Sequence, residues 1–417
     1  MRTRIILLFF LLSGFSLFSQ DRLYIHKTDR MTLGAAATTT DSIYFSNDES
    51  MAYFRMGSIL AEYPVEEIDS ITFGSNADTV YVDYDGEGVS VINPRAFEGV
   101  DVAVSGWNIT VTSTIADTEI YYNLSGETSS GSFKIYSDED FHVLLNSLEL
   151  TNPVGPAINI QSGKDAYVVL MDGTTSILSD GQYYNEPPAG EDQKAAFFSE
   201  GDMHFGGEGT LTINGNGSGQ HALSSDDELE INSGTIHINC DYNDGINAND
   251  LLQIDGGVVN ITVDGDASKG MNSDTTIYLS GGLVTIHNTG DAVLEASGNG
   301  YDPSYCTAVS SDFNVILDGA EVTIVASGKA SRGISVGADI DISAGSLQVT
   351  STGNGATYTN TSGQADAYTA VCLNADGNIN ITGASVTTSS SGSAGKGITC
   401  DGTLTIGLLD SGPDIHV

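Results

Sequence analysis

Three consecutive stretches decide the fold: residues 229–240 read LEINSGTIHINC, residues 252–263 read LQIDGGVVNITV, and residues 277–288 read IYLSGGLVTIHN. In each stretch, apolar residues occupy positions 1, 3, 8 and 10, and a glycine occupies position 6. Apolar alternation with a period of two, in largely β-branched residues, predicts strands that bury one face. A glycine at a fixed point between two strands predicts a turn with positive φ, which glycine adopts at no steric cost.

The same pattern recurs along the chain at intervals of 23 to 26 residues. The first apolar pairs of the strong units are Met203/Phe205, Leu229/Ile231, Leu252/Ile254, Ile277/Leu279, Val315/Leu317, Ile340/Ile342, Ile379/Ile381 and Leu404/Ile406. Two intervals widen to 38 and 39 residues, because loops are inserted near 299–306 and 353–369, and weaker copies lie at 141–150 and 167–178. Units this short cannot bury their own apolar face, so they must stack. The expected fold is all-β, a right-handed parallel β-helix of about ten coils.

The first residues predict export. Residues 1–19 have the form of a signal peptide, in which Arg2 and Arg4 precede an apolar run over 5–12 and a small-residue segment that ends before Gln20. The run is too short to span a bilayer, and no second one follows. We therefore expect a mature protein without a transmembrane segment, secreted or held at the cell surface.

The remaining chain is predicted to contain two parts. Residues 20–74 are expected to form a small β-module, because the pentapeptide DSIYF returns there as DSITF. Residues 75–417 are expected to form the β-helix, with leading strands over 79–135 and coils from about residue 140.

The charge limits the partners. The chain carries 55 acidic against 14 basic residues, a formal net charge of −41. Such a surface excludes nucleic acid as a ligand and argues against direct electrostatic capture of an acidic polysaccharide. An acidic excess of this size must be well solvated or neutralised by cations.

The chain has four cysteines and no CxxC spacing, which argues against a zinc site and suits an oxidising compartment. Cys372 and Cys400 lie nearly one coil apart at similar offsets. Stacked neighbours fall within the Cα range of a disulfide, so this pair is predicted to form one. Cys240 and Cys306 could meet only through the inserted loop.

Three segments carry a family resemblance: IYYNLSGETSSGSFKIYSDEDFHVLLNSLELTNPVGPAI (120–158), KAAFFSEGDMHFGGEGTLTINGN (194–216) and YNDGINANDLLQIDGGVVNITVDGDASKG (242–270). Through them, residues 78–406 resemble the bacterial exported carbohydrate-binding β-helix proteins of the pectate-lyase-like superfamily. The resemblance implies a parallel β-helix that binds polysaccharide and calcium. The N-terminal module is similar to a short leader unit on other exported surface proteins, whereas the loop around Cys306 does not map onto the family pattern.

In a stacked fold, equal offsets within the unit form columns one coil apart. Six oxygen-bearing side chains fall at neighbouring offsets over three units and are predicted to converge on one turn edge: Asp241, Asn243, Asp244, Asp264, Asp266 and Asp291. Carboxylates about 5 Å apart repel one another unless a cation lies between them, and calcium accepts six to eight oxygen ligands in flexible geometry. The sequence therefore predicts a calcium site at this edge. The alternative is that these aspartates hydrogen-bond to their own turns, as Asx residues do.

Two other columns are charged. An acidic column lies three residues before the first pairs and runs the length of the repeat, which favours a structural role in turns: Glu200, Asp226, Asn249, Asp274, Asp312, Asp376 and Asp401. A basic column contains Lys269, Arg332 and Lys396, and Asp244 holds the same offset one coil before Lys269. Charge pairing along the stack is one interpretation. The family resemblance implies another, in which Lys269 is the base of a calcium-dependent polysaccharide lyase, although no second basic residue stands nearby in sequence to bind a uronate carboxylate.

Sugar rings stack on exposed aromatic faces, and the candidates lie in the predicted loops: Tyr242, Tyr183, Tyr184, Tyr301 and Tyr305. Tyr242 stands beside the predicted calcium site. Trp107, the single tryptophan, is expected in the core of the leading strands.

Together these features predict a non-catalytic, calcium-dependent polysaccharide-binding protein whose ligand is a plant cell-wall polymer such as pectate or cellulose. A lyase with Lys269 as base is the main alternative, and a purely structural surface protein is a third. No carboxylate pair for glycoside hydrolysis and no Ser-His-Asp signature stands out in the sequence.

Overall fold

The computed structural model describes residues 21–75, 77–407 and 414–416, so the predicted signal peptide lies outside the described residues. The chain divides into two compact units: unit 1 comprises Met1–Asp78 and Ile92–Glu98, and unit 2 comprises Thr79–Val91 and Gly99–Val417. The boundary falls after Asp78, where the sequence placed it after residue 74, and a later segment joins unit 1. In the described ranges the only helices are two 3-10 turns, and none is long and apolar enough to cross a membrane.

Unit 1 is a pair of small antiparallel sheets. Strand β1 (Arg22–Lys27) pairs with β2 (Met31–Ala36) and with β6 (Ile68–Gly74). The second sheet contains β3 (Thr40–Phe45), β4 (Met51–Met56) and β5 (Ile59–Pro64), and the 3-10 turns η1 (Ala37–Thr39) and η2 (Val65–Glu67) precede β3 and β6. The repeated pentapeptides thus form corresponding strands, β3 and β6. The buried core of unit 1 is small and comes from β1, β2 and β4: Leu23, Ile25, Ala35, Ala52, Phe54 and Met56.

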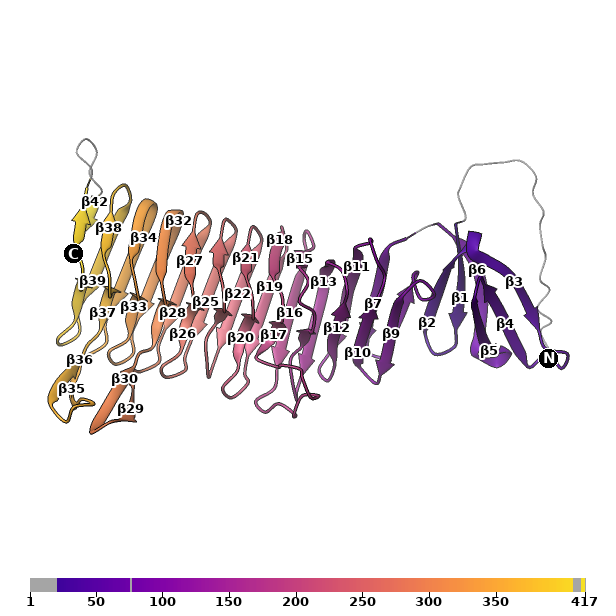
Figure 1. Cartoon of the computed structure of the whole chain (residues 1–417), viewed down its shortest axis with the longest axis horizontal. Helices are drawn as coiled ribbons and strands as arrows, with labels where there is room; N and C mark the ends of the chain where they lie inside the picture. Colours follow the sequence, from indigo (N-terminus) through magenta and orange to yellow (C-terminus); the bar gives the residue numbers. More distant parts are fainter. Residues whose placement is uncertain (1–20, 76, 408–413, 417) are drawn as a thin grey trace. The chain divides into compact units, whose positions relative to one another are not determined.

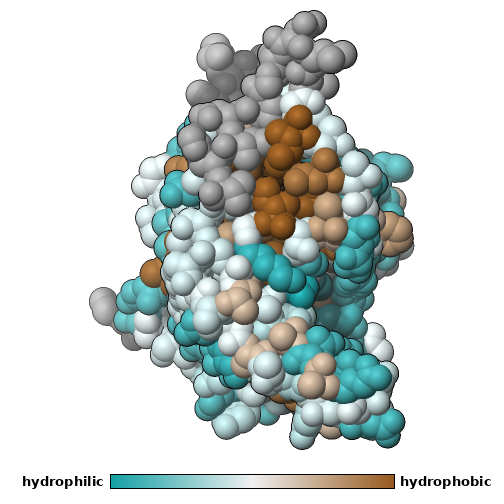
Figure 2. All heavy atoms as spheres, turned by 90° about the vertical axis from the view of Figure 1, so that its left-hand side faces the viewer, coloured by the Kyte–Doolittle hydropathy of each residue, from teal (hydrophilic) through white to brown (hydrophobic). Residues whose placement is uncertain are grey.

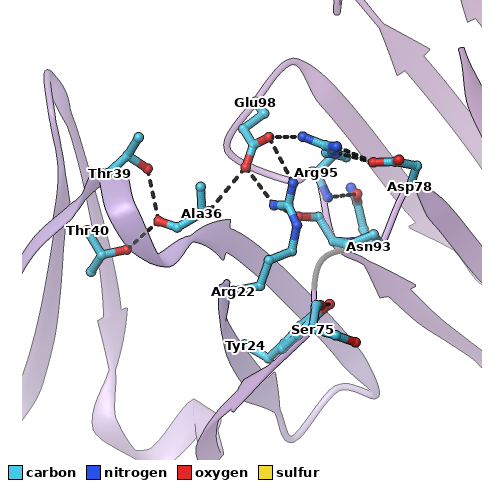
Figure 3. A network of polar contacts seen from close by, with 11 residues as sticks. Arg22, Tyr24, Ala36, Thr39, Thr40, Ser75, Asp78, Asn93, Arg95 and Glu98 are labelled. Carbon is cyan, nitrogen blue, oxygen red and sulfur yellow. Dashed lines mark hydrogen bonds and ion pairs between the residues drawn. The ribbon is translucent and has the colours of Figure 1, made fainter. Parts of the chain in front are cut away.

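A buried ion-pair network closes unit 1 (Figure 3). The Arg22 side chain, only 2% exposed, donates to Glu98 Oε1 and to the Pro94 carbonyl, both at 2.6 Å. Arg95 bridges Glu98 and Asp78. Burial alone raises the pKa of Glu98, but hydrogen bonds and charges from the two arginines outweigh it and hold that pKa below its usual value. The network therefore fastens β1 to the segment 92–98.

Unit 2 contains one twelve-stranded sheet whose strands are parallel apart from the antiparallel pair β9 and β10 (Figure 1). In spatial order, its strands are β9 (Val100–Ser105), β10 (Asn108–Ser113), β12 (Ser132–Ser137), β14 (Ile158–Ile160), β17 (Ala195–Ser199), β20 (His221–Ser225), β23 (Ile246–Ala248), β26 (Lys269–Ser273), β31 (Thr307–Ser311), β33 (Arg332–Val336), β37 (Val371–Ala375) and β40 (Lys396–Cys400). Successive strands of this sheet come from successive sequence repeats. One repeat therefore adds one strand.

The two apolar pairs of each repeat form further strands that stack in the same way. Leu229 pairs with Leu252 and Leu252 with Ile277, while Ile236 pairs with Val259, all in parallel register. The strands are β7 (Thr79–Asp85), β11 (Ile120–Thr128), β13 (Phe141–Asn152), β15 (Ala166–Leu170), β16 (Thr175–Asp180), β18 (Met203–Gly207), β19 (Thr210–Gly215), β21 (Leu229–Ile231), β22 (Thr235–Cys240), β24 (Leu252–Ile254), β25 (Val258–Val263), β27 (Thr276–Leu279), β28 (Leu283–Asn288), β32 (Asn314–Ala326), β34 (Ile340–Ser351), β38 (Ile379–Ile381), β39 (Ser385–Ser390), β41 (Leu404–Ile406) and β42 (Asp414–His416). A further strand, β8 (Val89–Asn93), precedes the repeats. The predicted all-β fold of stacked parallel strands is confirmed.

The glycine at position 6 of the repeat adopts the predicted conformation. Gly234, Gly257 and Gly282 have φ of 94°, 77° and 81°. A Cβ on Gly257 would lie 2.5 Å from the carbonyl oxygen of Gly234 in the preceding repeat. The turn therefore requires glycine both for its backbone angle and for the close approach of the neighbouring repeat.

Both inserted loops fold as antiparallel hairpins, which the sequence did not indicate. The first is β29 (Val293–Ser297) with β30 (Gly300–Ser304), and the second is β35 (Ala356–Thr359) with β36 (Ala365–Tyr368). The Asn299 amide donates to the Thr361 carbonyl at 2.8 Å, and buried Tyr368 packs with residues of both insertions. The two hairpins thus support each other.

The last repeat exposes part of the apolar interior. Leu404 and Ile406 of β41 are exposed, whereas the equivalent residues of β38, Ile379 and Ile381, are fully buried. Figure 2 looks onto this end of unit 2 and shows apolar residues gathered there. The stacked core therefore reaches the surface at β41.

Candidate functional site

The predicted site residues lie along the edge of the twelve-stranded sheet at which its strands begin, rather than on an outermost strand. The connections that lead into β17, β23, β26 and β31 contain the five tyrosines and the six predicted calcium ligands. In the described ranges, the longest connections between repeats, including both inserted hairpins, also enter this sheet (Figure 1). Predicted site residues from four connections are thereby brought to the same edge.

The predicted calcium residues form a ladder along this edge. Cys240, Val263 and Asn288 are in register, so the residues that follow them are stacked one repeat apart. The Asp291 amide donates to Asp266 Oδ1 at 2.8 Å, and the Lys329 amide donates to Asp291 Oδ1 at 2.7 Å. These two carboxylates thus accept hydrogen bonds from the turn of the next repeat, whereas the Asx alternative places such bonds within the aspartates' own turns.

One carboxylate oxygen of Asp264, of Asp266 and of Asp291 is thus held by the next repeat, that of Asp264 by the Thr289 hydroxyl. Two groups of described residues bring three ligand atoms within 4.8 Å of one another: Asp165, Asp202 and His204, and Asp192, Glu200 and Asp226. Neither group includes any of the six predicted ligands. The ladder, however, leaves a second carboxylate oxygen of Asp266 and of Asp291 without a hydrogen bond in the described part of the chain.

A lysine already neutralises one of these groups. Lys194 Nζ lies 2.8 Å from Asp192 Oδ2 and 2.5 Å from Asp226 Oδ2. Burial lowers the pKa of Lys194, but these hydrogen bonds raise it further than burial lowers it. Burial, together with the charges of Asp226 and Asp192, raises the pKa of Glu200. The group is an ion-pair network that holds the 181–194 connection on the sheet.

The basic column is confirmed by the strand register. His221, Asp244, Lys269, Thr307 and Arg332 lie at one position on successive strands. Asp244 Oδ1 accepts the Lys269 amide at 2.6 Å, and Asp244 Oδ2 lies 3.4 Å from His221 Nδ1. Lys269 Nζ donates to the Ala267 carbonyl at 2.6 Å rather than to a carboxylate. Simple charge pairing between Lys269 and Asp244 side chains is therefore not what the structure shows.

Arg332 supplies a second cation in the column of Lys269, although it is not near Lys269 in sequence. It stands two strands from Lys269 in the same column, because the first inserted hairpin lengthens the sequence between them without adding a strand to this sheet. Burial lowers the pKa of Arg332, whose guanidinium carbon lies 3.4 Å from the centroid of the Tyr305 ring. The equal offsets of Lys269 and Arg332 were the signal in the sequence.

The tyrosines divide into two classes. Tyr183 is 72% and Tyr242 is 46% exposed, and Gln182 Nε2 donates to the Tyr242 hydroxyl at 3.2 Å, which joins the two connections that carry these rings. Tyr301 of β30 is also exposed and lies on the first inserted hairpin. These rings remain candidates for sugar contacts.

The other two predicted sugar-binding tyrosines make close contacts within the chain. The Tyr184 hydroxyl donates to Asp180 Oδ2 at 2.6 Å. Burial raises the pKa of Tyr184, and the negative charge of Asp180 raises it further. The ring of Tyr305 is covered by Arg332. The Tyr184 hydroxyl and one face of the Tyr305 ring are thus occupied by contacts within the chain.

A polar column, missed in the sequence, lies on the sheet beside this edge. Its side chains are amides and hydroxyls at one position of successive strands: Ser224, Asn247, Asn272, Ser310, Ser335 and Asn374. Asn272 Nδ2 donates to Asn247 Oδ1 at 2.9 Å, and Arg332 Nη1 donates to Ser335 Oγ at 2.9 Å. From Asn272 onward these groups are partly exposed and can exchange hydrogen bonds with hydroxyl groups of a ligand.

A stack of rings covers another face of unit 2. Tyr121, His142, Tyr167 and His204 stand on β11, β13, β15 and β18, with successive ring centroids 4.2, 5.0 and 5.0 Å apart. Because the rings stack face to face, they present edges rather than faces to solvent. The stack therefore does not offer the flat platform that a sugar ring requires.

The predicted disulfide is not formed. All four cysteines are free, and Cys400 pairs in register with Ala375 rather than with Cys372. Val371 lies opposite Lys396, so this coil is shorter than the separation of the two cysteines. Burial raises the pKa of the Cys306 and Cys240 thiols to about 11, which favours inert, protonated side chains.

The chain is similar to known carbohydrate-binding proteins. A carbohydrate-binding domain-containing protein from Acetivibrio thermocellus is 27% identical to this chain over 120 residues. These residues are 28% of this chain and 41% of that protein, so the match spans less than half of the relative. The solved structure of a polysaccharide lyase-like protein from C. thermocellum gives a TM-score of 0.48 at 21% identity, covering 59% of this chain and 90% of that one. A family model described as carbohydrate-binding domain-containing protein matches residues 105–410. The chain therefore belongs to the family of carbohydrate-binding domain-containing proteins.

Proposed function

We propose that the chain is an exported, non-catalytic protein that binds an extended polysaccharide along one edge of the twelve-stranded sheet, with calcium as a cofactor. The observation that carries this proposal is the joint placement of Tyr183, Tyr242 and the polar column on that edge. Aromatic faces and amide or hydroxyl groups at regular spacing suit a polymer of hydroxylated rings. The family described above supports a carbohydrate ligand.

The stacked strands suit such a ligand because they repeat. We propose that they form the right-handed β-helix of about ten coils that the repeat predicts, so that each coil offers an equivalent polar rung. A regular polymer then meets the same groups at each rung. Binding strength accumulates over several weak contacts.

Calcium fits the acidic ladder through its donor chemistry. Asp266 and Asp291 each retain a carboxylate oxygen that is not bonded to a turn, and calcium prefers oxygen ligands. Two or three such oxygens are too few for six to eight ligands, so carboxylates of an acidic polymer would complete the set. This account gives calcium a bridging role and selects pectate among cell-wall polymers, with a neutral glucan such as cellulose as the alternative ligand.

A calcium-dependent polysaccharide lyase is the second candidate, and one observation favours it. Lys269 and Arg332 lie in one column with Thr307 between them, which supplies a base and a cation for a uronate carboxylate. The tie of Lys269 Nζ to the Ala267 carbonyl and the covering of Tyr305 by Arg332 both occupy these groups in the chain itself. We therefore favour polysaccharide binding over lysis as the function.

The proposed site is tested by tyrosine replacement. We expect Y183A/Y242A to weaken retention in an affinity gel of pectate or cellulose at least tenfold, because the two exposed rings supply most of the stacking surface at this edge. F313A removes an aromatic ring that is 57% exposed but follows β31 at the opposite end of the strand, and retention should not change. Equal retention of both variants would contradict the site.

A second assay, of product absorbance, separates binding from lysis. Ultraviolet absorbance of unsaturated uronate products, recorded on pectate with calcium, should stay at background for the wild-type chain. Product formation that is lost in both K269A and R332A would replace the binding proposal by the lyase.

A further inference from the structure

Trp107, a large aromatic residue expected in the core, lies in a hairpin turn. It sits with Gly106 in the two-residue turn between β9 and β10, where Ser105 pairs with Asn108, and it is partly exposed. Gly106 has φ of 62°, as the first central residue of a type II′ hairpin turn requires. The turn therefore holds a large aromatic side chain at the surface of unit 2.

Trp107 is one of the residues that line a hollow of about 370 Å³. Glu127, Glu149, Thr128 and Thr151 line the same hollow. An adjoining hollow of about 420 Å³ shares Glu127 and Glu149. Each volume falls within the range of small-ligand pockets, about 300–1,000 Å³. Every lining residue belongs to unit 2.

Stacked carboxylates form the floor of these hollows. Asp85 pairs with Glu127 and Glu127 with Glu149 on the parallel strands β7, β11 and β13. No lysine or arginine is among the residues that line either hollow. An anionic sugar would be repelled here, whereas the hydroxyl groups of an uncharged sugar can donate to the carboxylates in charge-assisted hydrogen bonds.

The remaining groups complement the same ligand. Thr128 and Thr151 provide hydroxyls that both donate and accept, and the indole N–H is a donor. The flat apolar face of the indole can pack against the C–H face of a pyranose ring. An aromatic plane beside acceptors and hydroxyls is an arrangement that recognises a neutral pyranoside.

We propose that the hollow at Trp107 is a second saccharide site, which binds an uncharged pyranoside without calcium. It is separate from the proposed polysaccharide edge, which begins at the connection into β17, because β12 and β14 lie between β10 and β17 in the twelve-stranded sheet. The inference goes beyond the first site and does not depend on it. One chain would then hold an acidic polymer through calcium at one place and a neutral glycan directly at another.

Trp107 also reports on its own site, because it is the single tryptophan of the chain. Fluorescence of the full mature chain is titrated with cellohexaose, with maltohexaose and with a galacturonate oligomer, all in chelator. We expect a saturable change in tryptophan emission with a neutral oligosaccharide and none with the galacturonate oligomer. E149Q and E127Q should each weaken the neutral ligand at least fivefold, because each replaces a charged acceptor by a neutral one of the same shape.

Two comparisons complete the test. Y183A/Y242A should leave the fluorescence titration unchanged, which separates this site from the proposed edge. Calorimetry with W107A checks that the fluorescence change reflects binding at the indole, and circular dichroism with thermal melting checks that each variant is folded. The proposal is overturned if neither neutral oligosaccharide changes the emission, if folded E127Q and E149Q bind as tightly as the wild type, or if the signal requires calcium.

Discussion

Single glycines determine how closely successive repeats approach. Gly257 needs a left-handed backbone, and its missing Cβ makes room for the Gly234 carbonyl of the previous repeat. Gly173 also has positive φ, at 70°, but an added Cβ there would meet no atom within 4 Å. A substitution at Gly173 therefore adds backbone strain alone, whereas one at Gly257 adds backbone strain and a steric clash.

We expect G173A to lower the free energy of unfolding by about 1–2 kcal/mol, the cost of a left-handed conformation for alanine. G257A should lower it by about 2–4 kcal/mol, since displacement of the neighbouring backbone is added to the strain. Denaturant unfolding of both variants measures the difference. Equal losses would show that the repeats can move apart without cost.

His221 shows how burial at the site edge affects proton binding. Burial lowers the pKa of His221, and the nearby Asp244 carboxylate, which acts in the opposite direction, does not compensate. The unfolded chain therefore binds a proton at a pH where the folded chain does not. The stability that results is complete above the unfolded pKa of about 6.5 and is lost as the pH falls below it.

Replacement by glutamine removes this titration. We expect the melting temperature of H221Q to fall less than that of the wild type between about pH 7.5 and pH 5. H287Q replaces an exposed histidine on β28 and should follow the wild type. A pH profile of H221Q that matches the wild type throughout would refute the effect of burial.

At the scale of the element, ion pairs fasten strands that hydrogen-bond ladders alone do not hold. Glu98 pairs with Arg22 of β1 and with Arg95, and its pKa is lowered, so its contribution is present above about pH 4.3 and lost as the pH falls further. Removing the carboxylate takes away the ion pair of the buried Arg22 side chain and leaves its hydrogen bond to the Pro94 carbonyl. Breaking a buried ion pair by removing one partner is costly.

We expect E98Q to destabilise unit 1 by about 3 kcal/mol at neutral pH, the lower part of the range for a broken buried pair. Hydrogen exchange of the β1 and β2 amides measures this as loss of protection. E62Q changes an exposed glutamate of β5 and serves as the matched control. Unchanged protection in E98Q would show that the Figure 3 network does not hold the element.

The elements that repeat were predictable, and those that interrupt the repeat were not. Period-two alternation and the fixed glycine identify each strand and turn because stacking imposes them in every unit. Nothing local in the inserted segments indicates that they fold as paired hairpins that pack against each other. Tyr183 and Tyr184 are adjacent in sequence, yet only the path of the chain exposes one and ties the other to Asp180.

For the whole molecule, the net charge of −41 is the dominant long-range property. It repels an acidic polymer at distances beyond contact, and added salt screens this repulsion. A calcium ion shared between protein and polymer carboxylates reverses the sign of the interaction locally. The proposed requirement for calcium therefore follows from the charge of the chain as much as from the acidic ladder.

The most direct measurement of the central claim is equilibrium binding to polygalacturonate as a function of calcium, for the wild type and for D266A. We expect chelator to abolish binding of the wild type. D266A should need several-fold more calcium for half-maximal binding, because it loses one bridging carboxylate while the fold and the exposed tyrosines remain. Binding that is equally tight in calcium and in chelator, for both proteins, would contradict calcium-bridged recognition and leave the acidic ladder as a row of turn caps.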